Sequence, residues 1–240
     1  MVAKRALVVG VGPGLGSAVA YFLLSDGYEV LISSRNKRHL EIIKGSLNRY
    51  GKIYTVVADA SLEEGSILIA KKAAECLKHI DALVITAGDY MPTDINKISD
   101  KEITYLFSVN FKSPLLLVGS TMHLMRSGSS VVLVSSVLSR WKESKGSVAY
   151  ASTKAAVARL AEGLASELVK LGIRVNAVAP LSMKHDFKPG REWKKERKLG
   201  AKECPPEDVA AVVRWLCSDD SDWVDGAVIP VDGGGRFLDK

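Results

Sequence analysis

Residues 6–16 read ALVVGVGPGLG, an apolar run followed by a glycine-rich turn. The apolar run predicts a buried strand, and the residues after Gly16 can begin a helix. Such a strand, turn and helix N-terminus form an anion site, because backbone N–H groups and the helix dipole favour negative charge. Gly10, Gly14 and Gly16 have the spacing G-x-x-x-G-x-G, with Gly12 and Leu15 between them. The turn predicts a phosphate cradle; a tight strand-to-helix connection without a ligand is the alternative.

The alternation of apolar strands and helix-length segments continues to the end of the chain. Runs that predict strands lie at residues 6–10, 29–33, 54–58, 82–86, 130–135, 174–178 and 227–231. Helices between successive strands predict parallel pairing, with helices on both faces of the sheet. We therefore expect a single α/β domain with a doubly wound parallel sheet of about seven strands. A chain of 240 residues with 47% hydrophobic content can bury such a core.

Local signals mark several helix starts. Residues 61–64 and 99–102 both match the S-x-x-E capping box. Pro205 and Pro206 precede two acidic residues, a pattern that suits the first turn of a helix. The long segment 181–204 has no clear periodicity, and we expect it to be a substrate lid loop.

The end of the second predicted strand indicates which dinucleotide the cradle would take. A dinucleotide fold normally places there an acidic residue for NAD, or an arginine that accepts the 2′-phosphate of NADP. This chain has Ser34, Arg35 and Asn36 at that place, with no carboxylate among them. The sequence therefore favours NADP over NAD, although an ordinary exposed arginine is the alternative.

Candidate catalytic residues follow the fifth predicted strand. Tyr150 and Lys154 are four residues apart in a predicted helix, which places them on one face. A nearby ammonium lowers the pKa of a phenol, so Tyr150 could act as a general acid or base. Ser135 and Ser136 end the strand at the edge where open parallel sheets form their binding crevice, although a simple strand-end turn is the alternative.

Asn110 is a poor helix former inside the predicted helix 103–118. Pro114 lacks the N–H that would bond to the carbonyl of residue 110, so we expect a kinked helix with that carbonyl free. The free carbonyl could hold a water that extends a proton relay; the alternative is a simple kink with water on the solvent side.

Composition excludes several classes of protein. No apolar run reaches the roughly 20 residues of a membrane span, and we expect a cytoplasmic protein. The three cysteines and four histidines lack metal-ligand or disulfide spacing, so no metal is expected. The net charge is +6, and residues 184–202 are rich in Lys and Arg. No nucleic-acid-binding motif accompanies this segment, so a solvated lid is favoured over a nucleic-acid interface, and an anionic substrate remains a hypothesis.

Taken together, the motifs resemble those of the short-chain dehydrogenase/reductase family over essentially the whole chain. The matching pieces are Gly10, Gly14 and Gly16; Asp59 and Ala60; Ala87 and Gly88; Asn110; Ser136; Tyr150 with Lys154; the run from Asn176 to Pro180; and Asp232 to Gly234. The resemblance implies a Rossmann-type fold and an NADP-dependent oxidoreductase that interconverts a ketone or aldehyde and an alcohol. It also implies a homo-oligomer, a tetramer or dimer built on the helices that contain Asn110 and Tyr150.

The family likeness assigns a role to each matching side chain. It implies that Tyr150 donates or accepts the proton and that Ser136 orients the substrate oxygen. Lys154 would bind the nicotinamide ribose and tune Tyr150, while Asn110 would support a water relay. For the cofactor, the implied contacts are Asp59 at the adenine, and Ala60, Ala87, Gly88, Pro180 and Ser182 along the rest of the dinucleotide.

Some positions depart from the family pattern. Val9, Thr86 and Leu181 replace the usual Thr, Asn and Gly, and His185 stands where a Thr often contacts the nicotinamide amide. Ser136 precedes Tyr150 by fourteen residues, one more than is typical, which leaves Ser135 as a rival. A non-catalytic dinucleotide-binding regulatory protein is the alternative function. For the substrate pocket, Trp141, Met183, Phe187 and Trp193 are candidate apolar walls, or else support for the core or the lid.

Overall fold

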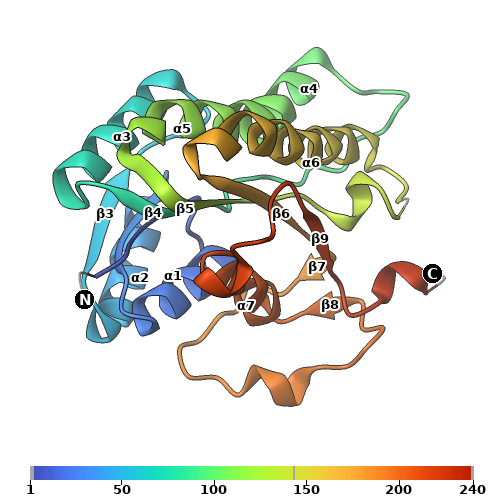
Figure 1. The fold of residues 1–240 in the computed structure, drawn as a ribbon. Helices are drawn as coiled ribbons and strands as arrows, with labels where there is room; N and C mark the ends of the chain where they lie inside the picture. The colour runs from blue at the N-terminus through green and yellow to red at the C-terminus, as the bar shows by residue number, and fades with distance from the viewer. Residues whose placement is uncertain (1–2, 143, 239–240) are drawn as a thin grey trace.

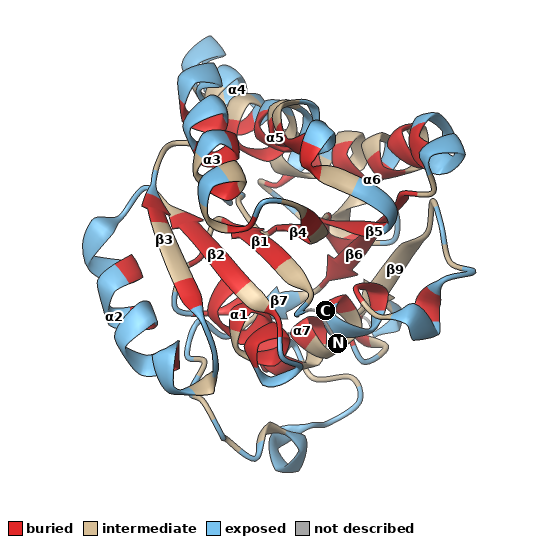
Figure 2. Cartoon of the chain, turned by 60° about the vertical axis from the view of Figure 1, so that its left-hand side comes forward, coloured by how far each residue is buried: buried red, intermediate tan, exposed pale blue. Residues whose placement is uncertain are grey.

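The predicted parallel sheet of about seven strands is confirmed in a computed structural model, which describes residues 3–142 and 144–238. Seven strands form one parallel sheet in the order β3-β2-β1-β4-β5-β6-β9 (Figure 1). Their bounds are β1 (Arg5–Val9), β2 (Glu29–Ser34), β3 (Ile53–Val57), β4 (Ile80–Ile85), β5 (Met125–Val134), β6 (Arg174–Pro180) and β9 (Val228–Val231). The interior strands are buried on both sides, as parallel strands covered by helices must be, which explains their continuous apolar runs (Figure 2).

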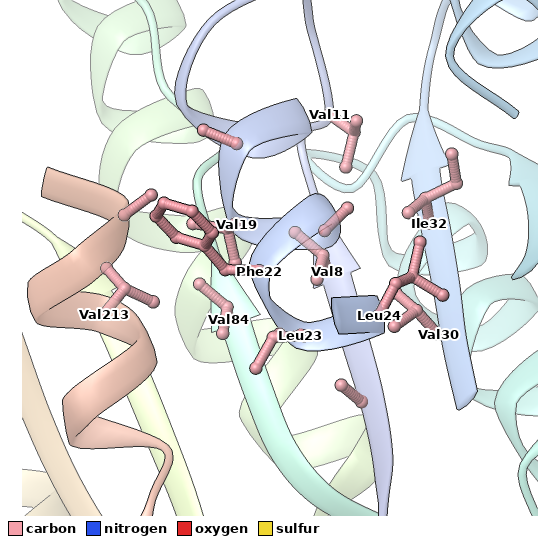
Figure 3. Close-up of a cluster of buried hydrophobic side chains, with 14 of the residues drawn as sticks. Val8, Val11, Val19, Phe22, Leu23, Leu24, Val30, Ile32, Val84 and Val213 are labelled. Atoms are coloured by element: carbon pink, nitrogen blue, oxygen red, sulfur yellow. The ribbon is translucent and has the colours of Figure 1, made fainter. Parts of the chain in front are cut away.

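Helices cover both faces of the sheet, as predicted. On one face lie α1 (Leu15–Ser25), α2 (Lys37–Leu47) and α7 (Pro206–Leu216) (Figure 1). The opposite face carries α3 (Glu63–Cys76), α4 (Asp100–Phe107), α5 (Ser113–Thr121) and α6 (Val148–Leu168). Each face has its own apolar cluster. In the cluster under α1, Phe22 and Leu23 pack with Val213 of α7 and with Val84 of β4 (Figure 3).

Short elements complete the chain. They are the two-residue strands β7 (Ser182–Met183) and β8 (Glu203–Cys204), which pair in parallel, the π-helical turn η2 (Ser108–Lys112), and the 3-10 turns η1 (Asn48–Tyr50), η3 (Met122–Leu124), η4 (Val137–Ser139), η5 (Val169–Leu171), η6 (Trp193–Glu196), η7 (Asp219–Ser221) and η8 (Gly235–Phe237). Within the residues that the structure describes, no helix has the length and apolarity to cross a membrane.

One of the two predicted capping boxes is confirmed. Ser99 accepts a hydrogen bond from the backbone of Glu102, whose side chain in turn accepts one from the Ser99 backbone. The box at residues 61–64 is wrong, because α3 begins at Glu63 and the Ser61 hydroxyl instead donates to Asp59, at 2.7 Å. The predicted helix start after Pro205 is confirmed by α7, which begins at Pro206.

The strand order places a crevice next to the predicted phosphate cradle. The chain runs from β1 outward to β3 and then returns to β4, which pairs with the other side of β1. Helices that follow β1 and β4 therefore leave the sheet on opposite faces. In open parallel sheets, ligands bind outside the carboxyl ends of the strands at such a switch point.

Candidate active site

The glycine turn between β1 and α1 is fixed by close backbone contacts. Gly10 has φ +89°, and a Cβ there would lie 2.2 Å from the Ala87 nitrogen. A Cβ on Gly16 would lie 2.7 Å from Cα of Val11, so only glycine lets α1 start this close to the turn. Gly12 differs, since a Cβ there would meet no atom within 4 Å. Gly10 and Gly16 are therefore required by packing, whereas Gly12 leaves open space where a ligand could approach.

The glycine turn and three of the four predicted catalytic residues, Ser136, Tyr150 and Lys154, line one cavity of about 810 Å³, whereas Asn110 is outside the described lining. Its walls include the glycine turn, Ser136, Tyr150, Lys154 and residues 180–183. Of the predicted cofactor contacts, Gly10, Gly12, Gly14, Leu15, Gly16, Gly88, Pro180 and Ser182 also line it. Helix α6 thus brings Tyr150 and Lys154 to the mouth of the glycine turn, as a dinucleotide bound there would require.

Lys154 is held inside this cavity as a buried ammonium. It is 4% exposed, and its Nζ donates to the carbonyl of Val134 at 2.9 Å. Burial lowers the pKa of Lys154 to about 8, because the charged form loses its hydration. The ammonium lies over the Tyr150 ring, 5.7 Å from its centroid.

The expected lowering of the Tyr150 pKa by Lys154 is wrong in this structure. Burial raises the pKa of Tyr150 above its ordinary value, and a hydrogen bond with Ser136 offsets part of that rise. The neighbouring groups Tyr90 and Asp89 raise it further. Desolvation of the phenolate therefore decides the direction of the shift, and residue spacing along a helix does not reveal it.

The two serines at the end of β5 have different partners. Ser136 lowers the pKa of Tyr150 through its hydroxyl and caps η4, where its Oγ accepts from the Leu138 backbone at 3.2 Å. Ser135 is buried, and its hydroxyl donates to the Lys154 carbonyl at 2.8 Å. Ser136 is thus the serine next to the candidate general acid, while Ser135 fastens β5 to α6.

Asn110 lies in a π-helical turn rather than at a simple kink. Helices α4 and α5 are joined by η2, where the Ser113 N–H bonds to the carbonyl of Ser108, five residues back. The missing N–H of Pro114 is compatible with this wider turn. The predicted break in the helix is therefore present at Asn110, in π-helical form, and the water at its carbonyl stays a prediction.

The side chain of Asn110 clamps the turn that follows β4. It is 1% exposed, accepts from the Asp89 N–H at 2.9 Å and donates to the Asp89 carbonyl at 3.0 Å. A third bond joins its amide to Thr153, at 3.0 Å. A Cβ on Gly88 would lie 3.0 Å from Asn110 Oδ1 and 2.9 Å from Lys154 Nζ. Asn110 thus helps to shape the wall beside Lys154.

A second group of predicted residues lies outside the cavity lining, at the ends of β2 and β3. The Arg35 guanidinium is 3.8 Å from the Asp59 carboxylate, and its side chain is about half exposed. Burial alone would raise the pKa of Asp59, but hydrogen bonds from Ser61 and the charge of Arg35 lower it. Asn36 caps α2, with Ser34 bonded to its backbone. Ala60 is buried.

Two further residues connect this group to the cavity, and sequence reasoning missed both. Asp89 lines the cavity, and its carboxylate accepts from the Tyr105 hydroxyl at 2.6 Å. The bond with Asp89 and burial raise the pKa of Tyr105 of α4, and Arg35 in turn offsets part of that rise. Asp89 directly follows the Ala87-Gly88 pair, so its place after β4 was a signal that could have found it.

The segment 181–204 is fastened to the body of the protein at several points. The Phe187 N–H donates to the Pro13 carbonyl at 3.0 Å, and the ring packs against Tyr21. Trp193 packs against Phe22 and donates to Asp208, at 3.1 Å. Phe187 and Trp193 are therefore support for the core, not cavity walls, and Trp141 is also absent from the lining among the described residues. Met183 does line the cavity.

Four of the eight Lys and Arg residues in the basic segment 184–202 have carboxylate partners. Arg191 forms a two-pronged pair with the buried Glu207, at 3.0 and 2.6 Å. Further pairs join Lys184 to Glu196, Lys195 to Glu192 and Arg197 to Asp208. His185 is the member that reaches the cavity, and its Nδ1 would lie 3.1 Å from a Cβ on Gly14.

Comparison with known proteins decides the family. A family model described as enoyl-(acyl carrier protein) reductase matches residues 10–235. The chain belongs to the short-chain dehydrogenase/reductase family. Human dehydrogenase/reductase SDR family member 4 is 31% identical over 242 residues, which cover 96% of this chain and 87% of that protein. This short-chain dehydrogenase/reductase thus belongs to a family of oxidoreductases.

Solved structures agree with this assignment. A dehydrogenase/reductase from Sinorhizobium meliloti is 26% identical with a TM-score of 0.89, over 98% of this chain and 96% of that one. A short chain dehydrogenase from Burkholderia cenocepacia in complex with NADP is 25% identical with a TM-score of 0.87, over 98% of both chains. The seven-stranded sheet of this short-chain dehydrogenase/reductase is therefore the family's fold.

Proposed function

We propose that this short-chain dehydrogenase/reductase is an NADP-dependent enzyme that interconverts a ketone or aldehyde and an alcohol. One observation carries the proposal: Ser136, Tyr150 and Lys154 line the same cavity as the glycine turn at residues 10–16. A bound nicotinamide cofactor supplies or accepts the hydride. Neither the geometry nor the comparisons favour the alternative of a non-catalytic regulatory protein.

The chain's own residues transfer the proton and bind the substrate and the cofactor. Tyr150 donates a proton to the carbonyl oxygen in reduction and accepts it from the hydroxyl in oxidation. Ser136, whose hydroxyl lowers the pKa of Tyr150, holds the same substrate oxygen. Lys154 binds the nicotinamide ribose with its buried ammonium. Asn110 keeps the Gly88-Asp89 turn in place and supports the water relay.

The preference for NADP rests on the second group of residues. In this proposal Arg35 binds the 2′-phosphate with help from Ser34 and Asn36, because a guanidinium offers several donors to one phosphate. Asp59, beside Arg35, meets the adenine, with Ala60 next to it. The Burkholderia cenocepacia relative in complex with NADP supports this choice. The remaining contacts come from the glycine turn, Ala87, Gly88, Pro180 and Ser182.

We also propose that the enzyme is a cytoplasmic homo-oligomer, a tetramer or dimer, built on the helices that contain Asn110 and Tyr150. The exposed apolar side chains Phe107, Leu115 and Val148 on these helices support the assembly. Residues 181–204 would act as the substrate lid loop through the part that reaches the cavity, since Met183 and His185 line it.

The function is tested by following NADPH absorbance during a screen of ketones and aldehydes. We expect turnover by the native protein and none by Tyr150→Phe, which still binds NADPH. Tyr90→Phe is the matched control, because the Tyr90 ring packs 5.0 Å from that of Tyr150. Turnover that survives in Tyr150→Phe, or a protein that binds NADPH but reduces no carbonyl compound, would contradict the proposal.

A further inference from the structure

A second lysine lines the cavity. Lys142 belongs to the loop between η4 and α6, so it lies between Ser136 and Tyr150 in the chain. Its Nζ donates to the carbonyls of Gly235 and Leu238, at 3.0 and 3.3 Å. These two bonds hold the ammonium in one place, on the part of the cavity wall that follows Ser136.

The cavity contains little negative charge to balance this ammonium. Within residues 3–142 and 144–238, Asp89 is the carboxylate in the lining, and it is bonded to Tyr105. No carboxylate of the described residues lies within 4.0 Å of Lys142 Nζ. An ammonium has three N–H donors, and the two carbonyls use two of them. One donor therefore remains for an oxygen of a ligand.

Other side chains near Lys142 in the sequence suit the same ligand. Ser144 and Ser147 line the cavity too, and the Ser147 hydroxyl lies 3.2 Å from the hydroxyl of Tyr90. Hydroxyl groups donate readily to a carboxylate oxygen. By contrast, no Lys or Arg of residues 184–202 is in the described lining, and four of these eight cations take part in the ion pairs described above. The positive charge available to a substrate is therefore at Lys142, not in the basic segment.

We propose that Lys142 binds a carboxylate of the substrate, so that the enzyme acts on oxo acids and hydroxy acids. This inference rests on the proposed function for the identity of the reacting carbonyl. The carboxylate would occupy the wall at Lys142, Ser144 and Ser147, while the carbonyl carbon lies at Ser136 and Tyr150. Lys142 is then a residue that selects acidic substrates and takes no part in proton or hydride transfer.

Binding, rather than turnover, tests this inference. The probes are a series from 4-oxopentanoate to 7-oxooctanoate and the methyl ester of each acid. Isothermal titration calorimetry would be run on the Tyr150→Phe protein, with and without NADPH, so that a failure of the proposed catalysis leaves the test intact. For at least one chain length, we expect the acid to bind about ten- to hundredfold more tightly than its ester, as for a hydrogen bond between charged groups.

Three further substitutions, each made in the Tyr150→Phe protein, then distinguish a role of Lys142 in binding the carboxylate from a role in stability. Lys142→Met should remove the preference for the acid and leave the affinity for the ester unchanged, and Lys142→Arg should restore the preference. Lys145→Met is the matched control, because Lys145 lies in the same loop but is exposed and outside the described lining. Equal binding of acid and ester, no binding of either, or an equal loss of both in Lys142→Met would overturn the proposal; the last result would make Lys142 only an anchor for the C-terminal turn.

Discussion

The Lys154 ammonium lies 5.7 Å from the centroid of the Tyr150 ring and is almost fully buried. Its bond to the Val134 carbonyl does not restore the hydration that it lost, since burial lowers the pKa of Lys154 from 10.5 to about 8. The cation that the proposed reaction needs is therefore held at a cost in stability.

Replacing Lys154 with methionine should stabilise the folded protein at pH 7. The folded state holds the Lys154 proton less tightly than the unfolded state, so the penalty is complete below pH 8 and disappears as the pH rises from about 8 to 10.5. A shift of this size corresponds to roughly 3 kcal/mol as an upper bound. Urea denaturation of both proteins from pH 7 to pH 10 measures the difference. The control Lys170→Met replaces an exposed lysine, so its unfolding free energy should equal that of the native protein across this pH range. A Lys154→Met protein less stable than the native one at pH 7 would refute the argument.

Removing the Ser136 hydroxyl should shift the titration of Tyr150 to higher pH. Burial raises the pKa of Tyr150, and the bond with Ser136 offsets part of that rise. In Ser136→Ala, the alkaline rise in kcat/KM for alcohol oxidation should therefore begin at a higher pH than in the native enzyme. Ser152→Ala, whose hydroxyl bonds to the Val148 carbonyl, is the control and should keep the native profile. An unchanged profile in Ser136→Ala would speak against a Ser136–Tyr150 bond.

Replacing Gly12 or Gly10 with alanine should have different effects on the unfolding free energy and on NADP binding. Gly12→Ala meets no protein atom within 4 Å, so its unfolding free energy should change by less than about 0.5 kcal/mol while the Kd for NADP rises. Gly10→Ala would force a side chain against the Ala87 nitrogen at φ +89°, which should cost about 2 kcal/mol or more. Thermal melting and NADPH fluorescence measure the two effects. A Gly12→Ala protein that binds NADP like the native one would place the cofactor elsewhere.

Arg35→Ala should weaken NADP and leave NAD unchanged. A charge-assisted bond to phosphate contributes about 1.5–3 kcal/mol, so the Kd for NADP should rise roughly ten- to hundredfold. The comparison is made by thermal shift with both cofactors at matched concentration, where the native protein should be stabilised more by NADP. Arg49→Ala serves as the control, since Arg49 lies over the Tyr50 ring in η1. An equal loss of NADP and NAD would show that Arg35 does not discriminate between them.

The fold was predictable because its signals are local. Each strand contains a short apolar run, and the glycine spacing identifies the turn after β1 before any long-range contact is known. A prediction from a local signal failed where another side chain competed for the same hydrogen bond. The Ser61 box is the example, because the Asp59 carboxylate two residues earlier takes the serine hydroxyl and backbone N–H.

The parts of the site that escaped prediction depend on contacts between distant residues. Asn110 bonds to Asp89 and Thr153, which lie 21 and 43 residues away. Phe187 and Trp193 could not be assigned to the core without knowing that α1 lies beneath them. The direction of the Tyr150 pKa shift depends on burial, which spacing along a helix does not reveal. Lys142 is noticed only once the cavity is known.

The carbonyls of Gly235 and Leu238 that hold Lys142 have a practical consequence for anyone who expresses this protein. They lie in and just after η8 (Gly235–Phe237), so this turn holds in place a lysine that lines the cavity, although the turn itself is outside the described lining. A deletion that begins at Gly235 would remove both carbonyls from Lys142 while leaving the sheet intact, because β9 ends at Val231. A cleavable tag placed before β1 avoids this turn, because β1 begins at the amino ends of the strands and the cavity lies at their carboxyl ends.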